Sequence, residues 1–470
     1  MTHRKLVRDT FLTVITLITF GSTNFLFNVA IGRFFGSDFL GKVSTALSTS
    51  LLIGYIVSTS IPSAVAKYIS ECLGNDEDKK ANYVMWMSLI YAILVGGFAT
   101  SFTIVFAPSI SDFFKIPSDI FLLFTPIILL YGLYMVLKMA YYGYRRADLY
   151  FKKEIFSDVL FFIVLAAIIF FKLKNYTFAP YIVLYSSFIL LSIPFIRGKI
   201  KYKFADKQIK RKFFAFAGIS FLGTFSSMAM RSLAIMLSSI YVPPNEVGYL
   251  SAAFSISAIF FLFPNAMGRV FMPEFSYHFG KGNKGEIIKL LNSSTDYLGI
   301  MVTIVNGLGI IFAPFIVKLF YSEEFLPSAL ILQILLFGFW FTMLGRPAVS
   351  VLSGTKYIHI PNIGGILGLS FAIFSWWFLI PTNGILGTVI GYVGGVIITM
   401  SYILYHAKKQ YGLNIYNILI HFFVFVLIFL TVTSYMFVGL YVSFIGISFL
   451  VFYVFLFRGK ISLILKKIFI

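Results

Sequence analysis

The sequence predicts an all-α polytopic membrane protein with about fourteen transmembrane helices. Hydrophobic residues fill 59% of the 470 positions, charged residues fill only 12%, and the mean hydropathy is +0.91. Soluble domains carry about 25% charged residues, so a water-soluble fold could not hide this much apolar surface. The composition therefore excludes a soluble enzyme, a disulfide scaffold and a disordered chain.

Apolar runs long enough to cross a bilayer follow one another along the whole chain, since a spanning helix needs roughly 20 residues. The predicted spans are residues 11–32, 43–65, 82–107, 118–140, 155–172, 178–195, 213–240, 247–274, 295–317, 327–350, 360–380, 384–405, 415–435 and 438–457. The first run follows a short basic head and is too long for a signal peptide, so we expect it to be retained.

The basic residues predict the orientation of these spans. With the N-terminus in the cytoplasm, 29 of the 38 Lys and Arg residues fall in cytoplasmic segments, six in outer segments and three inside spans. This asymmetry follows the positive-inside rule, and an even number of spans places both termini in the cytoplasm. The net charge of +20 is therefore mainly topological and does not indicate nucleic-acid binding.

The largest basic loop suggests how the chain is divided. We predict an N-lobe of spans one to six (1–196), a basic cytoplasmic loop (197–212), a C-lobe of spans seven to twelve (213–409), and a final helix pair with a basic tail (410–470). The basic residues of the loop are expected to anchor it at anionic lipid head groups.

The two predicted lobes resemble each other in sequence. Gly41, Ala46 and Ser48 before and within span two match Gly248, Ala253 and Ser255 before and within span eight at one constant offset. Each segment then continues through a proline-bearing helix into a charged cytoplasmic loop. Both repeats enter their helices from the same side, so we predict parallel repeats with a substrate site between two bundles, as in transporters.

Three arginines inside the spans are the candidate site residues, because a charge within a membrane span is costly and usually functional. Arg231 lies about nine residues from the outer end of span seven, whereas Arg269 and Arg346 lie nearer the cytoplasmic ends of spans eight and ten. We expect the acids that reach furthest in, among them Asp158 and Asp296, to stop at the cytoplasmic rim. Cations without deep acids favour a site for an anion such as phosphate, although internal ion pairs or snorkelling are the structural alternatives.

Uncharged polar residues extend this candidate site. Asn24 and Asn28 share one face of span one because they are four residues apart, and we include both as lesser substrate contacts. Asn306 and Gln333 are expected to form interhelical hydrogen bonds. Glycines spaced four apart in spans eleven and twelve predict close helix packing, at Gly364, Gly368, Gly387, Gly391 and Gly395.

The sequence contains no convincing catalytic, metal or cofactor site. The segment 36–43 nearly matches a phosphate-binding P-loop but lacks the final Ser or Thr, and the GxGxxG pattern of 280–285 lies in a loop between spans. No two histidines have metal-ligand spacing. We therefore expect a protein that is not an enzyme and that needs no cofactor.

Several segments together resemble the polysaccharide transporter branch of the multidrug/oligosaccharidyl-lipid/polysaccharide (MOP) exporter superfamily. The matching segments are Arg33-Phe-Phe-Gly with Phe39-Leu-Gly41, Asn245-Glu-Val-Gly248-Tyr-Leu-Ser-Ala-Ala, Phe320-Tyr-Ser-Glu-Glu-Phe325, Leu352-Ser-Gly354-Thr-Lys and Gly384-Ile-Leu-Gly387. The resemblance implies two six-helix lobes, two extra C-terminal helices and a cationic cavity, which Arg231, Arg269 and Arg346 would supply.

This resemblance implies a flippase of the cytoplasmic (plasma) membrane that moves a polyprenyl-(pyro)phosphate-linked oligosaccharide by alternating access. Its partners would be this anionic lipid-linked substrate, membrane lipids and glycan-assembly enzymes, with no nucleic acid. One departure is Ser232, where family members often carry an acid. Spans one and seven also lack the acids on which the drug-exporting relatives depend, so a multidrug/cation antiporter is the alternative, followed by a membrane-embedded glycan-transferring enzyme.

Overall fold

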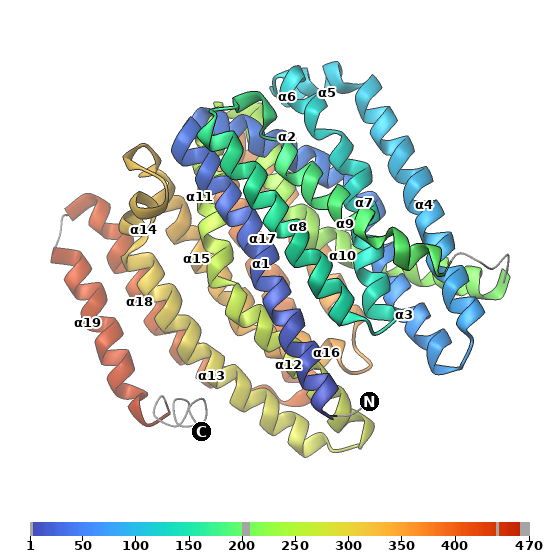
Figure 1. Cartoon of the computed structure of the whole chain (residues 1–470). Coiled ribbons are helices and arrows are strands. Elements are labelled where there is room, and N and C mark those ends of the chain that lie inside the picture. The colour runs from blue at the N-terminus through green and yellow to red at the C-terminus, as the bar shows by residue number, and fades with distance from the viewer. Residues whose placement is uncertain (1–2, 200–206, 439–440, 461–470) are drawn as a thin grey trace. The chain divides into compact units, whose positions relative to one another are not determined.

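The computed structural model describes residues 3–199, 207–438 and 441–460, and these residues form helices and no strand (Figure 1). Helices and their connections group into two compact units, Met1–Ser251 and Ala252–Ile470. The chain is therefore all-α, as the sequence predicts. The assignment of residues 1–196 and 213–409 to two six-span lobes stays a prediction.

Among the described residues, the first unit contains ten complete α-helices and the start of another. They are α1 (His3–Phe35), α2 (Ser37–Ser58), α3 (Ser60–Gly74), α4 (Asp78–Val105), α5 (Ala107–Phe113), α6 (Ser118–Phe124), α7 (Pro126–Gly143), α8 (Ala147–Phe170), the 3₁₀ helix η1 (Lys174–Tyr176), α9 (Ala179–Arg197), α10 (Lys207–Tyr241) and the first half of α11 (Pro244–Phe260). Helix α8 packs between α1 and α9, and α7 packs against α2, α3, α4 and α9. This packing places α7 at the centre of the unit.

The second unit continues with α11 and ends in the C-terminal helix pair. Its further elements are α12 (Leu262–Gly280), α13 (Lys284–Ile311), α14 (Ala313–Phe320), the 3₁₀ helix η2 (Glu323–Phe325), α15 (Ser328–Leu344), α16 (Arg346–Ser353), α17 (His359–Tyr411), α18 (Ile415–Val438) and α19 (Tyr441–Leu456). Figure 1 shows α13, α18 and α19 side by side, and α13 contacts both of the other helices. The C-terminal pair therefore packs on α13.

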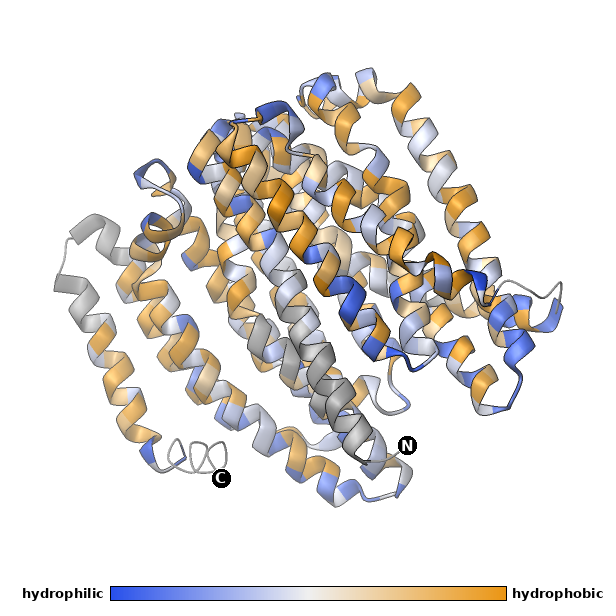
Figure 2. Cartoon of the chain, viewed as in Figure 1, coloured by the Kyte–Doolittle hydropathy of each residue, from blue (hydrophilic) through white to orange (hydrophobic). Residues whose placement is uncertain are grey.

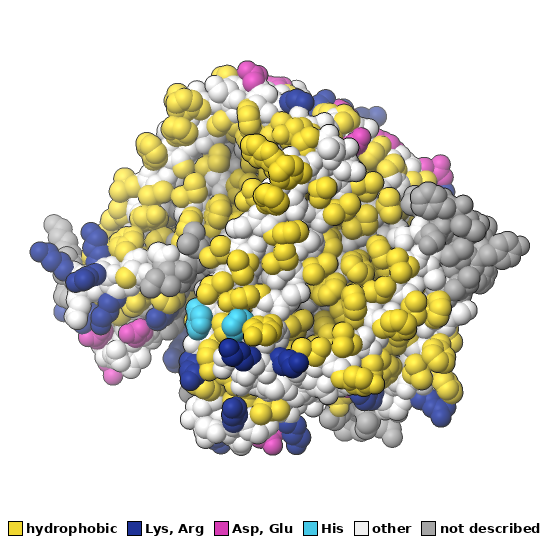
Figure 3. Space-filling view, turned by 180° about the vertical axis from the view of Figure 1, so that it is seen from behind, with side chains coloured by type: hydrophobic (Ala, Val, Ile, Leu, Met, Phe, Trp, Pro, Cys, Tyr) yellow, Lys and Arg dark blue, Asp and Glu magenta, His cyan; other side chains and the backbone are white. Residues whose placement is uncertain are grey.

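Each predicted span coincides with one helix, with two consecutive helices or with half of α17. By length and hydropathy alone, eight helical segments of the described chain qualify as membrane spans, or nine when the bent helix α10 counts as one. Figure 2 shows hydrophobic residues along most helices, and in Figure 3 hydrophobic side chains cover most of the visible face. The chain is thus a polytopic membrane protein.

Prolines explain why many spans are divided into two helices. A proline lacks the N–H that would bond to the carbonyl four residues earlier, and its ring clashes with that turn. Six helix breaks lie two to four residues before, or directly at, a proline: Pro62, Pro108 and Pro126 in the first unit, and Pro264, Pro314 and Pro347 in the second. Span two of the first predicted repeat and span eight of the second are thus each divided into two helices before a proline.

Glycines set the closest approaches between helices. A Cβ on Gly41 would lie 1.7 Å from the carbonyl oxygen of Pro244, and a Cβ on Gly248 would lie 2.1 Å from that of Ser37. Gly41 and Gly248 are the glycines that the sequence repeat pairs with each other. Their shared position at one helix crossing explains why neither can carry a side chain.

A glycine also turns α17 back on itself. Gly384 has φ 55° and ψ −132°, a backbone conformation that glycine adopts readily and other residues avoid. The two halves then pack closely: a Cβ on Gly387 would lie 1.9 Å from the carbonyl oxygen of Leu379, and Trp376 Nε1 donates to the carbonyl of Thr388 at 2.9 Å. The close packing predicted for the glycines of spans eleven and twelve is confirmed.

Candidate functional site

Three of the five predicted site residues meet in the first unit, in a group that we call the Arg231 cluster (Asn24, Asn28, Tyr181 and Arg231). Arg231 Nη2 of α10 donates to Asn24 Oδ1 of α1 at 3.4 Å. Asn24 Nδ2 donates to the hydroxyl of Tyr181 of α9 at 3.2 Å. Asn28 Nδ2 lies 2.7 Å from the Asn24 carbonyl and 3.3 Å from Asn24 Oδ1. Residues far apart in the chain thus form one polar group.

The oxygen of Asn24 that accepts from Arg231 belongs to an amide and carries no formal charge. Tyr55 of α2 lies beside Ser232 and near Arg231, and the hydroxyl of Tyr181 of α9 accepts from Asn24. Ser232, the residue that departs from the family pattern, is buried. The cluster therefore combines a cation with several neutral hydrogen-bonding groups.

The other two predicted arginines belong to the second unit. Ser350 Oγ of α16 donates to the carbonyl of Gly268 of α12 at 3.2 Å, and Arg346 Cδ lies 3.8 Å from the position of a Cβ on Gly268. Arg346 therefore lies against the backbone directly before Arg269. The side chain of Arg269 is outside the described part of the structure, and a single site that contains all five residues remains a prediction.

A second polar group in the first unit was not predicted from the sequence. We call it the α8 cluster (Tyr134 and Lys138 of α7; Tyr150, Glu154 and Asp158 of α8). The hydroxyl of Tyr134 donates to Glu154 Oε1 at 2.5 Å, and Lys138 Nζ donates to the same hydroxyl at 3.2 Å. Lys138 Nζ also lies 5.3 Å from the ring centroids of both Tyr134 and Tyr150. A chain of contacts therefore joins the ammonium to the carboxylate.

The two acids of this cluster are buried within the protein, which the sequence did not indicate. Glu154 is 0% exposed and Asp158 is 3% exposed. They lie ~10 Å and ~16 Å of helix rise after the first residue of α8, whose N-terminal half is visibly hydrophilic in Figure 2. Lys138 is also buried, within α7. The spacing of Glu154 and Asp158 could have indicated one shared helix face.

A third polar group, in the second unit, connects α13 to the C-terminal helices. We call it the Asp296 network (Asp296, His421, Tyr453 and Lys460). Asp296 Oδ1 lies 3.2 Å from His421 Nε2, and Lys460 Nζ donates to Asp296 Oδ2 at 2.6 Å. Tyr453 OH lies 2.5 Å from His421 Nδ1. The network joins α18 and the end of α19 to α13 through hydrogen bonds.

Two predicted structural roles are confirmed in the same unit. Asn306 Nδ2 of α13 donates to the Leu336 carbonyl of α15 at 3.2 Å, and Gln333 Nε2 of α15 donates to the Ile310 carbonyl of α13 at 3.0 Å. These amides join two helices as interhelical hydrogen bonds. Neither is assigned to a substrate site.

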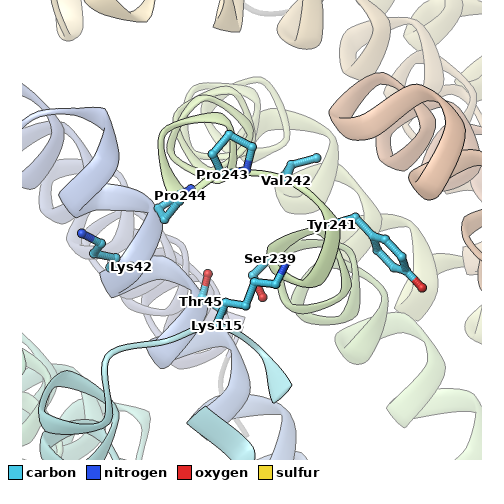
Figure 4. A pocket seen from close by; sticks show the side chains of 8 residues that line it. All are labelled: Lys42, Thr45, Lys115, Ser239, Tyr241, Val242, Pro243 and Pro244. Atoms are coloured by element: carbon cyan, nitrogen blue, oxygen red, sulfur yellow. The ribbon is translucent and has the colours of Figure 1, made fainter. Parts of the chain in front are cut away.

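Two pockets lie outside the predicted site residues. One has a volume of about 290 Å³ and is lined by Lys42, Thr45, Lys115, Ser239, Tyr241, Val242, Pro243 and Pro244. Figure 4 shows Thr45, Ser239 and Lys115 close together, while Tyr241 points away from them. The other is an apolar groove of about 570 Å³ on α18 and α19, lined by Tyr416, Leu419, Ile420, Phe423, Val424, Leu427, Phe449, Phe452 and Leu456. Among the described residues, no three His, Cys, Asp or Glu side chains are grouped as metal ligands.

Comparisons with known proteins agree with this helical architecture. Residues 13–171 match the family model MatE. A sequence search among curated proteins found no match. Structure comparison instead finds transporters with low sequence identity, as follows.

Three solved structures illustrate the likeness. A multidrug resistance MATE family transporter of the MOP superfamily in an inward-facing conformation has a TM-score of 0.70 and 17% identity, over 83% of this chain and 94% of that chain. The lipid II flippase MurJ in an inward closed conformation has a TM-score of 0.70 and 16% identity, over 96% and 99%. A MOP superfamily transporter from Pyrococcus furiosus has a TM-score of 0.61 and 16% identity, over 86% and 96%. The chain therefore has the fold of the MOP superfamily transporters.

Proposed function

We propose that this protein is a flippase that moves a polyprenyl-(pyro)phosphate-linked oligosaccharide across the cytoplasmic membrane by alternating access. The observation that carries this proposal is the Arg231 cluster, in which an arginine within a predicted membrane span donates to a neutral amide oxygen. A guanidinium can donate two parallel hydrogen bonds to phosphate or carboxylate, so it suits an anionic headgroup.

The remaining polar groups of the cluster suit the sugar. Asn28 and Tyr181 offer amide and hydroxyl groups within one or two hydrogen bonds of Arg231. Carbohydrates are recognised by such neutral donors and acceptors, which can also exchange with water when the cavity opens. Arg269 and Arg346, on helices of the second unit that contact each other, are proposed as further contacts to an anionic headgroup.

The lipid tail needs an apolar surface, and α18 with α19 supplies one. Their groove is lined by nine aromatic or aliphatic side chains, and burial of each CH₂ of a polyprenyl chain stabilises binding by about 0.8 kcal/mol. The lipid II flippase matches 96% of this chain, compared with 83% for the multidrug transporter. The larger coverage by a flippase that handles a lipid-linked substrate favours this substrate class.

Leaflet exchange in proteoliposomes tests the proposal directly. A fluorescent polyprenyl-diphosphate-oligosaccharide would be reconstituted with the protein, and a membrane-impermeant quencher would report the outer-leaflet fraction over time. We expect Arg231→Ala to slow exchange about tenfold to hundredfold, because a charge-assisted hydrogen bond contributes about 1.5–3 kcal/mol. Arg33→Ala, at the exposed last turn of α1, is the matched control and should exchange normally. Normal exchange by Arg231→Ala would contradict the site assignment.

A multidrug/cation antiporter is the second candidate, and two observations favour it. One similar structure is a multidrug transporter, and the α8 cluster supplies the buried acids whose apparent absence counted against antiport. Efflux of a cationic dye without leaflet exchange of the lipid-linked sugar would favour this function. A membrane-embedded glycan-transferring enzyme would instead release a free lipid carrier in the same vesicles.

The proposed function also implies a location and partners. The protein would lie in the cytoplasmic membrane with both termini on the cytoplasmic side, where the enzymes that assemble the glycan supply its substrate. Cysteine accessibility at an added N-terminal cysteine, with the buried Cys72 unreactive, would measure this orientation. Labelling from the outer side only would contradict it.

A further inference from the structure

A third pocket, of about 220 Å³, brings together three parts of the second unit that are far apart in the sequence. It is lined by Phe279, Gly282, Lys284, Ile287, Lys356, Tyr357, Gln410 and Tyr411. These residues come from the α12–α13 connection with its flanking helix ends, from the α16–α17 connection, and from the C-terminal end of α17. The pocket thus includes part of the glycine-rich segment 280–285, which lies between two predicted spans.

Every charged side chain that lines this pocket is a lysine. Neither Lys284 nor Lys356 has an acidic partner in the part of the chain that the structure describes. Lys356 Nζ lies 5.3 Å from the ring centroid of Tyr357, and Gln410 and Tyr411 add neutral polar groups. The pocket therefore combines positive charge with hydrogen-bonding groups, which suits an anion.

The residues around the pocket strengthen its positive potential. Segments 278–289, 354–359 and 407–412 contain six lysines but only one acid, Glu286, which lies 3.9 Å from Lys289 of its own helix. A concave site surrounded by charges of one sign concentrates the electric field and raises the local concentration of the opposite ion. An anion is therefore attracted to this pocket before it makes any contact there.

Contacts within the second unit hold the pocket walls in place. Ser276 Oγ of α12 lies 2.8 Å from the Gly354 carbonyl oxygen, and a Cβ on Gly354 would lie 2.9 Å from the Met272 carbonyl oxygen. The ring centroids of Tyr357 and Tyr411 lie 6.1 Å apart in an edge-to-face arrangement, and Tyr411 is buried. Because these contacts order the walls in advance, little free energy is lost in ordering them on binding.

We propose that this pocket binds a small phosphate-bearing anion, with Lys284 and Lys356 as its two counter-charges and Gln410 as a neutral contact. Lysine binds phosphate as a point charge, and two lysines on different connections suit one doubly charged group. Pockets for drug-sized ligands measure about 300–1,000 Å³. A pocket of about 220 Å³ therefore suits a phosphate or diphosphate group and is too small for a whole nucleotide.

A phosphate group can reach this pocket from two sources. On the predicted cytoplasmic side it is carried by anionic lipid head groups and by small ions in water, and both present the same oxygens to the lysines. The inference goes beyond the proposed function and does not depend on it, since none of the proposed substrate contacts lines this pocket.

Isothermal titration calorimetry with inorganic pyrophosphate tests the pocket, using the full-length protein in neutral detergent. Arg231→Ala serves as the background, so that the proposed transport site does not contribute to the measured heat. We expect saturable binding at one site per chain. Lys284→Gln and Lys356→Gln should each weaken this binding about fivefold, because each removes one solvent-exposed charge contact. The affinity should also fall as the salt concentration rises.

Lys289→Gln is the matched control, because it removes the same charge from an exposed position of α13 outside the pocket. It should change the affinity by less than about twofold. All three substituted lysines are exposed, so unfolding in detergent without pyrophosphate should give the same midpoint in each variant. Unchanged affinity in both pocket variants, or an equal loss in the control, would overturn the pocket.

Nanodiscs separate the two sources of phosphate. The titration is repeated in bilayers of phosphatidylcholine alone and of phosphatidylcholine with phosphatidic acid. A loss of pyrophosphate affinity in the second bilayer that is larger with Lys284 than in Lys284→Gln assigns the pocket to a lipid head group, whereas equal affinity in both bilayers assigns it to a soluble anion. Absence of saturable binding in detergent and in both bilayers would overturn the anion site, and leaflet exchange by the wild type would then still support the flippase.

Discussion

The α8 cluster and the Asp296 network contain the same kinds of groups but differ in how their hydrogen bonds are satisfied. Each joins carboxylate, lysine and tyrosine side chains within its own unit, and the Asp296 network adds a histidine. In the Asp296 network both carboxylate oxygens and both ring nitrogens of His421 have partners. In the α8 cluster three of four carboxylate oxygens have none in the described chain.

This difference separates a structural role from a functional one. A fully satisfied buried network holds elements in one arrangement, and removing one of its members leaves the others unsatisfied. An unsatisfied buried group destabilises the fold and persists where it serves another purpose. We therefore expect substitutions in the Asp296 network to reduce stability, and substitutions in the α8 cluster to reduce it less or not at all.

The largest expected effect is the loss of stability in Asp296→Ala. This variant leaves His421, which is 1% exposed, without its carboxylate partner and releases Lys460, so we expect about 3 kcal/mol of destabilisation. Unfolding in detergent by heat or denaturant measures it. Glu286→Ala, which removes an exposed acid of the same helix paired with Lys289 at 3.9 Å, should change stability by less than about 0.5 kcal/mol. Equal losses of stability in both variants would contradict a structural role for the Asp296 network.

Gly299→Ala tests the same network through its packing. A Cβ on Gly299 would lie 2.4 Å from His421 Cδ2, so the ring must move and its hydrogen bonds must distort, with an expected cost of about 2 kcal/mol. Gly285→Ala is the control on α13, since a Cβ there meets no atom within 4 Å. In a His421→Ala background the cost of Gly299→Ala should disappear, and a cost that persists would place the strain elsewhere.

Asp158→Asn should have a smaller effect, with the opposite sign. The amide keeps the shape of the side chain and removes a buried charge whose two oxygens have no partner among the described residues, so we expect the variant to be up to about 1 kcal/mol more stable above neutral pH. The matched substitution Asp296→Asn should destabilise, because it removes charge opposite Lys460. A strong loss of stability in Asp158→Asn would make the α8 cluster structural.

Sequence patterns predicted the helices well because hydrophobic length acts locally, whereas their breaks at prolines were seen only in the structure. Apolar runs placed the spans, and the repeat pattern identified Gly41 and Gly248, which meet at one helix crossing. The sequence singled out Arg231, Asn24 and Asn28 as site candidates but did not predict that Arg231 contacts Asn24.

The α8 cluster was missed for a physical reason. Lys138 and Glu154 lie near helix ends, where sequence alone suggests water, and burial arises only when α1 and α9 pack on α8. Similarly, His421 and Asp296 are far apart in the chain, so their contact depends on how the C-terminal pair packs on α13. Local patterns show which residues share a helix face but not which neighbour covers that face.

The smallest expected effect concerns Asp148, the exposed acid near the start of α8. It measures how little a solvent-exposed ion pair contributes to stability compared with the buried groups of the same helix. A hydrogen bond from Arg146 lowers the pKa of Asp148 below its usual value. A lowered pKa in the folded state stabilises the protein above the unfolded value and loses this contribution as the pH falls through the folded value. Asp148→Asn should therefore cost only about 0.3 kcal/mol at pH 7, and the difference from the wild type should shrink as the pH falls through the lowered pKa of Asp148. Unfolding curves over this range of pH measure it, and a difference that grows on acidification would show that burial, not the Arg146 pair, controls this acid.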